Sequence, residues 1–201
     1  MERRGFFTLG IKNMAKAAIN AADRQAEGRA SRWIRPPFAK RELDFLLACT
    51  RCDKCLLACE PQVLFLLSAR LGAQVVNTPA MDLTNKGCLM CDGWPCVAAC
   101  TPEALKLPEL IPTDSEDPLL PQPKLAEIRI NTQTCLPFSG PECGACLPAC
   151  PIPGALTLMA GRLPKIDSNH CTGCALCRLA CIVSPKAIEV YPRQNHPINN
   201  G

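Results

Sequence analysis

The chain has 201 residues, of which 16 are cysteine and 20 are proline, while aromatic residues make up only 4%. Its formal net charge of +4 counts every cysteine as a neutral thiol. We find no basic run interleaved with aromatic residues and no apolar stretch of about 18 residues, so we expect neither a nucleic-acid-binding patch nor a membrane-spanning helix. The scarcity of bulky core residues favours short elements wrapped around inorganic centres, in a loop-rich α+β fold.

Residues 1–40 are predicted to form a helix followed by a connector. An amphipathic helix is expected over residues 7–27. Its apolar face could pack on its own domain, or it could dock on a partner protein or peripherally on a membrane surface. The segment Arg35–Phe38 contains two prolines and is expected to be an extended connector. The apolar positions of the helix at helical spacing are Phe7, Ile11, Met14, Ala15, Ala18 and Ala22.

The segment Arg3–Phe7 resembles a twin-arginine export motif. An export signal also needs a following apolar stretch. That stretch is interrupted here by Lys12, Asn13, Lys16, Asn20 and Asp23. We therefore expect a cytoplasmic protein; the alternatives are export to the periplasm through a degenerate signal, or peripheral attachment at the inner membrane.

The next part of the chain, residues 41–107, is predicted to carry the first two of four cysteine motifs. A helix is expected over Lys40–Ala48, and Ala73–Val76 and Pro79–Leu83 are expected to pair as a hairpin. Residues 108–126 are rich in proline and acidic side chains, which predicts a surface insert.

Residues 127–191 are predicted to carry the last two motifs, and residues 192–201 a flexible tail. Alternating apolar positions and turn residues indicate four short strands in this region. These expected strands are Glu127–Asn131, Leu156–Met159, Leu163–Asp167 and Ala187–Tyr191. The recurrence of motif, strand, turn and strand predicts two ferredoxin-like modules with short β-hairpins and short helices.

The sixteen cysteines fall into four motifs of four, and none is left over. The first motif is Cys49, Cys52, Cys55 and Cys59; the second is Cys88, Cys91, Cys96 and Cys100; the third is Cys135, Cys143, Cys146 and Cys150; the fourth is Cys171, Cys174, Cys177 and Cys181. A [4Fe–4S] cube takes four thiolates, and in two-cluster ferredoxins the fourth cysteine of a motif binds the neighbouring cube. The spacing therefore predicts that all sixteen are iron ligands of four [4Fe–4S] clusters.

Local features of the motifs bear on this prediction. Three cysteines two residues apart curl around one cube, and the fourth is expected to start a short helix that leads away. The second and third motifs contain longer gaps, which can be spanned by loops. Gly144 and Gly173 lie between ligands, where the backbone must approach a cluster closely. Each cluster with its thiolates carries about −2, which would bring the net charge to about −4.

Two other uses of cysteine remain open from the sequence. Disulfides would require an oxidising compartment, and cysteines two residues apart are poorly placed to bridge each other. Structural zinc normally uses two cysteine pairs separated by a longer loop, whereas three or four cysteines are packed into each motif here.

The chain is not expected to be an enzyme with its own substrate site. Every cysteine is assigned as a ligand, so none remains as a nucleophile, and no phosphate-binding loop is present. The imidazoles are His170, expected at a turn or the surface, and His196 in the tail.

With these motifs established, the chain resembles the ferredoxin-type accessory proteins of periplasmic nitrate reductase systems and their relatives, of the NapF, NapG and MauM types. The resemblance covers nearly the whole chain. Arg3–Gly5, Ile34–Pro37 and Cys49–Glu60 look most like the NapF type. Pro95-Cys96 and Cys171–Cys174 look more like the NapG and MauM types.

The resemblance implies an electron carrier that serves a protein redox partner, either a reductase catalytic subunit or a quinol-linked membrane subunit. The alternative it implies is a cytoplasmic maturation factor that binds a molybdenum or iron–sulfur enzyme and supplies clusters or electrons. The four motifs could pair consecutively or in a nested order. We expect the nested order, first with fourth and second with third, because it occurs in four-cluster subunits of molybdenum oxidoreductases.

Overall fold

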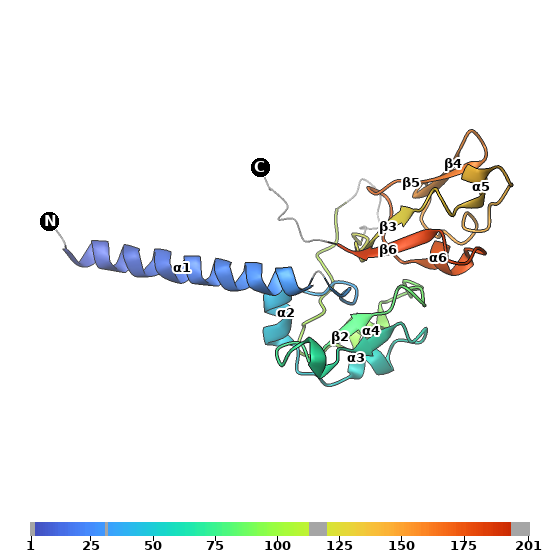
Figure 1. The fold of residues 1–201 in the computed structure, drawn as a ribbon. Coiled ribbons are helices and arrows are strands. Elements are labelled where there is room, and N and C mark those ends of the chain that lie inside the picture. The colour runs from blue at the N-terminus through green and yellow to red at the C-terminus, as the bar shows by residue number, and fades with distance from the viewer. Residues whose placement is uncertain (1–2, 31, 113–119, 194–201) are drawn as a thin grey trace.

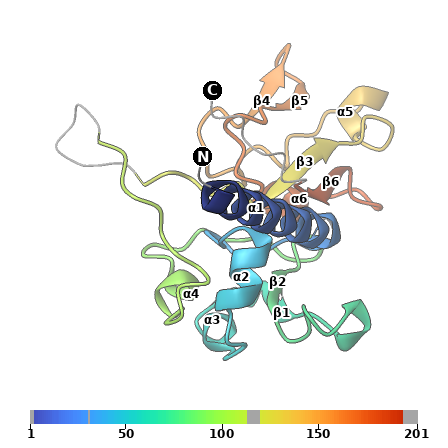
Figure 2. The same cartoon turned by 90° about the vertical axis from the view of Figure 1, so that its left-hand side faces the viewer.

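The structure is a computed structural model that describes residues 3–30, 32–112 and 120–193. A long helix, α1 (Arg3–Ala30), projects from a body made of short helices and short strands (Figure 1). The acidic centre of the predicted insert and most of the predicted tail lie outside the described residues. The body itself has two halves, which Figure 2 shows on opposite sides of α1.

The N-terminal half, residues 32–107, contains four short helices and one two-stranded antiparallel sheet of β1 and β2. The predicted helix before the first motif is confirmed as α2. The elements are α2 (Glu42–Ala48), α3 (Lys54–Leu57), β1 (Leu64–Leu66), the 3-10 helix η1 (Ala69–Leu71), β2 (Pro79–Met81) and α4 (Pro95–Ala98).

The C-terminal half, residues 120–193, contains two antiparallel two-stranded sheets, β3–β6 and β4–β5. All four strands predicted here are confirmed to within a residue or two. The elements are β3 (Ala126–Ile130), α5 (Leu136–Ser139), β4 (Leu156–Met159), β5 (Leu163–Ile166), α6 (Leu176–Ala180) and β6 (Ile188–Pro192). The molecule is therefore a loop-rich α+β fold, as predicted.

The predicted hairpin before the second motif is wrong in one strand. β2 pairs with β1, with Leu64 opposite Met81, and not with residues 73–76. Those residues form a turn in which the amides of Val75 and Val76 both donate to the carbonyl of Gly72. Gly72 has φ +114, a conformation that glycine adopts freely, so the chain reverses there before it can form a strand.

The predicted N-terminal helix is confirmed and begins earlier than expected, at Arg3, but its apolar residues do not gather on one face, so its predicted amphipathic character is wrong. The middle of the helix stands away from the body, with Met14 75% exposed and Ile19 60% exposed. The described side chains that contact the body lie in its last turns, where Asp23 forms an ion pair with Arg41 at 2.5 Å and Arg29 donates a hydrogen bond to Gln74 at 2.8 Å. Among the described residues, we find no helix with the length and apolarity that crossing a membrane requires.

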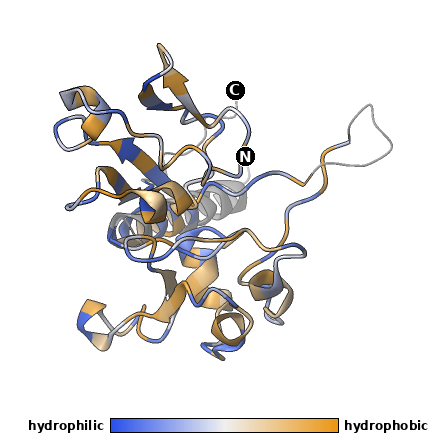
Figure 3. Ribbon diagram, turned by 90° about the vertical axis from the view of Figure 1, so that its right-hand side faces the viewer, coloured by the Kyte–Doolittle hydropathy of each residue, from blue (hydrophilic) through white to orange (hydrophobic). Residues whose placement is uncertain are grey.

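One hydrophobic core runs through both halves of the body. It includes Phe45 and Val97 from the N-terminal half and Ala126 and Ile188 from the C-terminal half. Hydrophobic positions are distributed through both halves in Figure 3. Many of the cysteines belong to this core, so burial of thiols takes a share of the role that large apolar side chains have in other domains.

The segment after α1 was expected to be a simple connector, but it is part of the packed body. The Arg35 guanidinium donates to both carboxylate oxygens of Glu42, at 2.9 and 2.5 Å, and to the Thr78 hydroxyl and the Pro79 carbonyl. It also lies over the Phe45 ring, 4.5 Å from its centroid. Glu42 is 3% exposed, so this ion pair satisfies a buried carboxylate.

Replacing Arg35 should therefore destabilise the N-terminal half strongly. Arg35→Met removes the partner of a buried carboxylate, and we expect the free energy of unfolding to fall by about 3 kcal/mol. Urea denaturation followed by circular dichroism measures the change. The matched control is Arg129→Met, which breaks an exposed pair with Glu127 and should leave stability at the wild-type value. Equal effects of the two substitutions would contradict this account.

Candidate cluster-binding sites

The sixteen cysteines are free thiols and gather into four groups, which we call quartets A to D. Each quartet takes three cysteines from one motif and the fourth from the neighbouring motif. Within the described residues, no three His, Cys, Asp or Glu side chains form a group suited to a single metal ion. A cube differs from a single ion because each of its thiolates is bound to a different iron atom.

Quartet A consists of Cys49, Cys52, Cys55 and Cys100, which line one small cavity next to Phe45. The first three come from the first motif, and Cys100 is the last cysteine of the second. Burial, followed by the charges of Cys100 and Cys49, raises the pKa of the Cys55 thiol to about 11. The four thiols therefore share one apolar pocket.

Quartet B consists of Cys59 with Cys88, Cys91 and Cys96. Burial raises the pKa of Cys96 to about 12, with Cys88 and Cys59 as the next contributors. Burial, together with the charges of Cys174, Cys59 and Cys91, likewise raises the pKa of Cys88 to about 11. Cys59 therefore lies with the second motif, although it belongs to the first.

Quartet C consists of Cys135, Cys143, Cys146 and Cys181. Burial is the largest cause that raises the pKa of both Cys135 and Cys146, and Cys181 contributes to both. The seven-residue gap between Cys135 and Cys143 contains the short helix α5, so the insertion predicted to be a loop is partly helical.

Quartet D consists of Cys150, Cys171, Cys174 and Cys177, which line a second small cavity next to Ile128. Burial raises the pKa of Cys177 to about 12, followed by the charges of its neighbouring thiols. Quartets A and D are thus equivalent pockets in the two halves.

The expected nested pairing of motifs is wrong. Cys59 lies with Cys88 and Cys96 of the second motif, and Cys181 lies with Cys135 and Cys146 of the third. The first motif therefore pairs with the second, and the third pairs with the fourth. The reason is that strands pair only within each half: β1 pairs with β2 between the first two motifs, and β3 pairs with β6 on either side of the last two.

The short helices carry the third cysteine of a motif, and not the fourth as expected. Cys55, Cys96 and Cys177 are the second residues of α3, α4 and α6. Each is followed four residues later by the fourth cysteine, about one helical turn away on the same side of the chain. This single turn places two thiols of one motif in two neighbouring quartets.

The loops between cysteines direct backbone amides at the sulfur atoms. Left-handed backbone conformations recur at Arg51 and Asp53 in the first motif and at Gly173 and Ala175 in the fourth. Such alternation makes a concave arrangement of amides that favours anions. Amides two residues on hydrogen-bond to the thiols in the pairs Cys52–Lys54, Cys88–Met90, Cys171–Gly173 and Cys174–Leu176.

Lysine ammonium groups lie against the backbone of two cysteines in the C-terminal half, a feature that the spacing alone does not reveal. Lys124 donates to the carbonyl of Cys171 at 3.0 Å, and Lys186 donates to the carbonyl of Cys181 at 2.8 Å. These charges would partly offset the negative charge of thiolates in quartets C and D.

The quartets have the chemistry that iron–sulfur clusters require. Burial raises the pKa of eight of these thiols, so those eight stay protonated unless a positively charged centre binds them. They are Cys55, Cys88, Cys96, Cys135, Cys146, Cys171, Cys174 and Cys177. The exposed Cys52 is different, because hydrogen bonds from the Lys54 amide and the Thr50 side chain lower its pKa. The inward amides and the left-handed turns then supply hydrogen bonds to the sulfur atoms.

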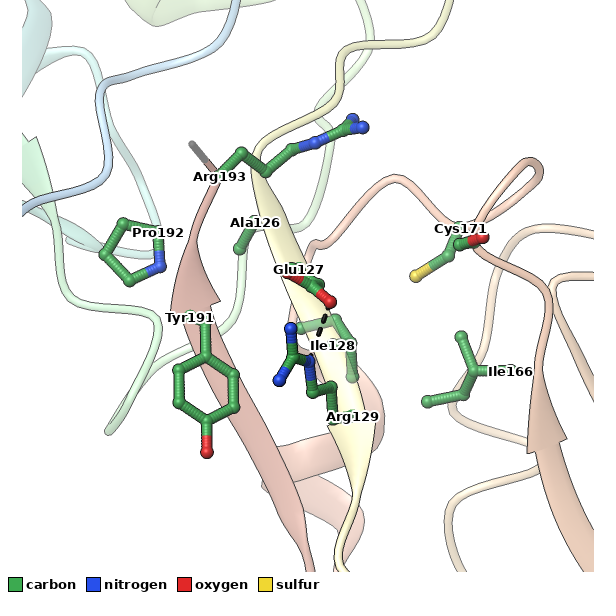
Figure 4. A pocket seen from close by; sticks show the side chains of 10 residues that line it. Ala126, Glu127, Ile128, Arg129, Ile166, Cys171, Tyr191, Pro192 and Arg193 are labelled. Atoms are coloured by element: carbon green, nitrogen blue, oxygen red, sulfur yellow. Dashed lines mark hydrogen bonds and ion pairs between the residues drawn. The ribbon is translucent and has the colours of Figure 1, made fainter. Parts of the chain in front are cut away.

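A groove of about 700 Å³ runs beside β3 and β6 (Figure 4). The ion pair of Glu127 with Arg129 lies along it, and the Arg129 guanidinium is 5.1 Å from the centroid of the Tyr191 ring. Cys171 of quartet D also faces this groove.

Outside the quartets, His170 is exposed and lies 2.8 Å from the Asp167 carboxylate, which confirms its predicted surface position. His196 lies outside the described residues.

Comparison with known proteins defines the class to which this chain belongs. It is 32% identical over 210 residues to the methylamine utilization ferredoxin-type protein MauM of Methylobacillus flagellatus, covering 96% of this chain and 85% of the relative. It is 33% identical over 208 residues to the ferredoxin-type protein NapG of Haemophilus influenzae, covering 95% of this chain and 72% of the relative.

A third relative is the ferredoxin-type protein NapF of Escherichia coli, 32% identical over 166 residues that cover 80% of this chain and 87% of the relative. No family model and no solved structure matches the chain. The protein is of the ferredoxin type, and the names of these relatives together with its sixteen cysteines indicate an iron–sulfur electron-transfer role. More narrowly, the chain belongs to the family of ferredoxin-type proteins that includes MauM, NapG and NapF.

The two glycines singled out in the sequence should differ sharply in their tolerance of substitution. Gly173 has φ +78, and a methyl group there would overlap the backbone of Ala126 in β3. Gly144 has nothing within 4 Å of the same position. We expect Gly173→Ala to lower the iron content of anaerobically purified protein by about a quarter or more, because quartet D distorts. Gly144→Ala should match the wild type, and iron loss in both variants would refute this distinction.

Proposed function

We propose that this protein binds four [4Fe–4S] clusters, one in each quartet, and carries electrons to or from a partner oxidoreductase. When bound, each cube would accept and release one electron. The chain's own residues supply the ligands, the apolar surroundings and the amide hydrogen bonds that set the potentials. All sixteen cysteines act as iron ligands in this proposal, and the protein has no substrate site of its own.

The grouping of the thiols is the observation that carries the proposal. Each quartet combines three cysteines of one motif with the last cysteine of its neighbour, as in ferredoxins with two clusters. The body would then consist of two ferredoxin-like modules that correspond to its two halves. Disulfides have no role in this arrangement, because every thiol is used as a ligand.

The partner is proposed from the family. The resemblance to the NapG and NapF types implies a nitrate reductase system, and the MauM relatives are named for methylamine utilization. We propose a nitrate-reductase-type respiratory partner, which could be a catalytic subunit or a quinol-linked membrane subunit.

Double substitutions test the shared ligation directly. The wild type should hold about sixteen irons per chain. Cys100→Ala with Cys52→Ala removes two ligands of quartet A, so one cluster is lost and about twelve irons remain. Cys100→Ala with Cys91→Ala removes ligands of quartets A and B, so about eight remain. Iron and sulfide analysis after anaerobic purification measures both.

The opposite order of iron contents would show that each motif binds its own cube. In that case Cys100 and Cys91 would serve one cluster, and Cys100 and Cys52 would serve two. A wild-type protein with zinc or without iron would refute the proposed function itself.

The exposed helix α1 favours a second candidate function, a maturation factor that binds an iron–sulfur or molybdenum enzyme. Met14 and Ile19 are exposed on a helix that leaves the body, which suits docking on another protein. Removing residues 1–22 leaves the Asp23–Arg41 ion pair in place. We expect the truncated protein to keep its iron.

The truncation separates the two functions by their effect on the partner enzyme. If reduction of the partner persists and its cofactor assembly fails, the maturation role is supported. If partner assembly is also unchanged, α1 has no part in maturation and this second candidate is rejected.

A further inference from the structure

The two halves of the body meet at a junction where a cysteine of quartet B contacts a cysteine of quartet D. The backbone amide of Cys88 donates a hydrogen bond to the carbonyl oxygen of Cys174 at 2.9 Å. Both residues are 7% exposed. The shortest bonded path between these two thiols therefore crosses one hydrogen bond between two backbones.

Neighbouring residues hold this junction closed. The Arg178 guanidinium in α6 donates to the Thr84 carbonyl at 2.7 Å, across the two halves. Gly87 lies so close to α6 that a methyl group there would come within 2.8 Å of a Leu176 methyl carbon and 3.1 Å of a Leu179 methyl carbon. The approach of the two halves thus depends on a residue without a side chain.

The quartets at the junction are more buried than the other two. In quartet B, Cys59, Cys88 and Cys96 are all at most 9% exposed. In quartet A, Cys52 is exposed, and the nearby Leu57 is 87% exposed. Ile182, directly after Cys181 of quartet C, is 70% exposed. Three cysteines of quartet B and two of quartet D are buried, against one each in quartets A and C, so A and C lie nearer to solvent.

We infer that the four quartets form one electron path in the order A, B, D, C, with the Cys88–Cys174 contact as the connection between the halves. Within each half, single helical turns already join the quartets: Cys55 to Cys59 joins A to B, and Cys177 to Cys181 joins D to C. This inference rests on the proposed function and adds the order of the sites to it.

The step across the junction is an electron transfer without bond changes. With clusters bound, the cysteines of quartets B and D would hold the electron donor and acceptor, and one electron would pass between them, so that one centre is oxidised as the other is reduced. No other reactant is consumed. Partners would contact the outer quartets, A and C, whose surroundings are exposed.

Two matched double variants isolate the inner and the outer pair of sites. Cys52→Ala with Cys143→Ala disables quartets A and C and leaves B and D. Cys91→Ala with Cys171→Ala disables B and D and leaves A and C. We expect the fully reduced inner-pair variant to show a spin-coupled EPR spectrum and the outer-pair variant to show two independent signals. Coupling in the outer pair, or none in the inner pair, overturns the order.

Substitution at the junction tests the contact in the protein with all sixteen cysteines. Gly87→Phe should force the halves apart, and the reduced protein should lose part of its spin–spin broadening while it keeps about sixteen irons. The control, Thr157→Phe, adds the same bulk at an exposed position in β4 and should leave the spectrum unchanged. Should Gly87→Phe lose iron, Arg178→Met replaces it. This substitution adds no bulk and removes the hydrogen bond to the Thr84 carbonyl across the junction, together with one to the Ile188 carbonyl within the C-terminal half.

The outcomes separate this inference from the function on which it rests. An unchanged spectrum in the junction variants, at wild-type iron content, would remove the Cys88–Cys174 connection and leave the four-cluster proposal intact. Loss of iron in the wild-type protein would instead remove both.

Discussion

The sharing of thiols between neighbouring motifs is the constraint on which the rest of the structure depends. In each motif the third and fourth cysteines are four residues apart, so one turn of chain delivers them to two different quartets. Two motifs must therefore fold together before either quartet is complete. The short sheets, the small helices and the buried thiols follow from that requirement, because little apolar surface remains to organise a larger core.

Much of this arrangement was predictable from the sequence. The spacing of the cysteines places each one in a motif, and the alternating residues of Leu156–Met159 and Leu163–Ile166 locate both strands of a hairpin. The pairing of the motifs was not predictable, because cysteine spacing is the same in nested and consecutive schemes. It is decided by contacts distant in sequence, such as Ile130 opposite Ile188. The turn at Gly72 likewise depends on a backbone conformation that residue alternation does not reveal.

The glycines show that one residue type can be required at different positions for different physical reasons. Gly173 was expected to allow close approach to a cluster, and the structure adds a second reason, the backbone of Ala126. Gly87 drew no attention in the sequence, since it precedes a motif and its requirement comes from α6 of the other half. Arg35 is similar: its charge suggests a surface residue, but Glu42 and Phe45 enclose it. These residues connect parts of the chain that sequence patterns treat separately.

The central claim is that sulfur quartets hold four iron–sulfide cubes, and anaerobic native mass spectrometry tests it most directly. The account predicts one dominant species, with the mass of the chain plus four [4Fe–4S] units and the loss of protons from all sixteen thiols. A dominant species that carries zinc ions, or one whose mass corresponds to eight disulfides and no iron, would contradict it.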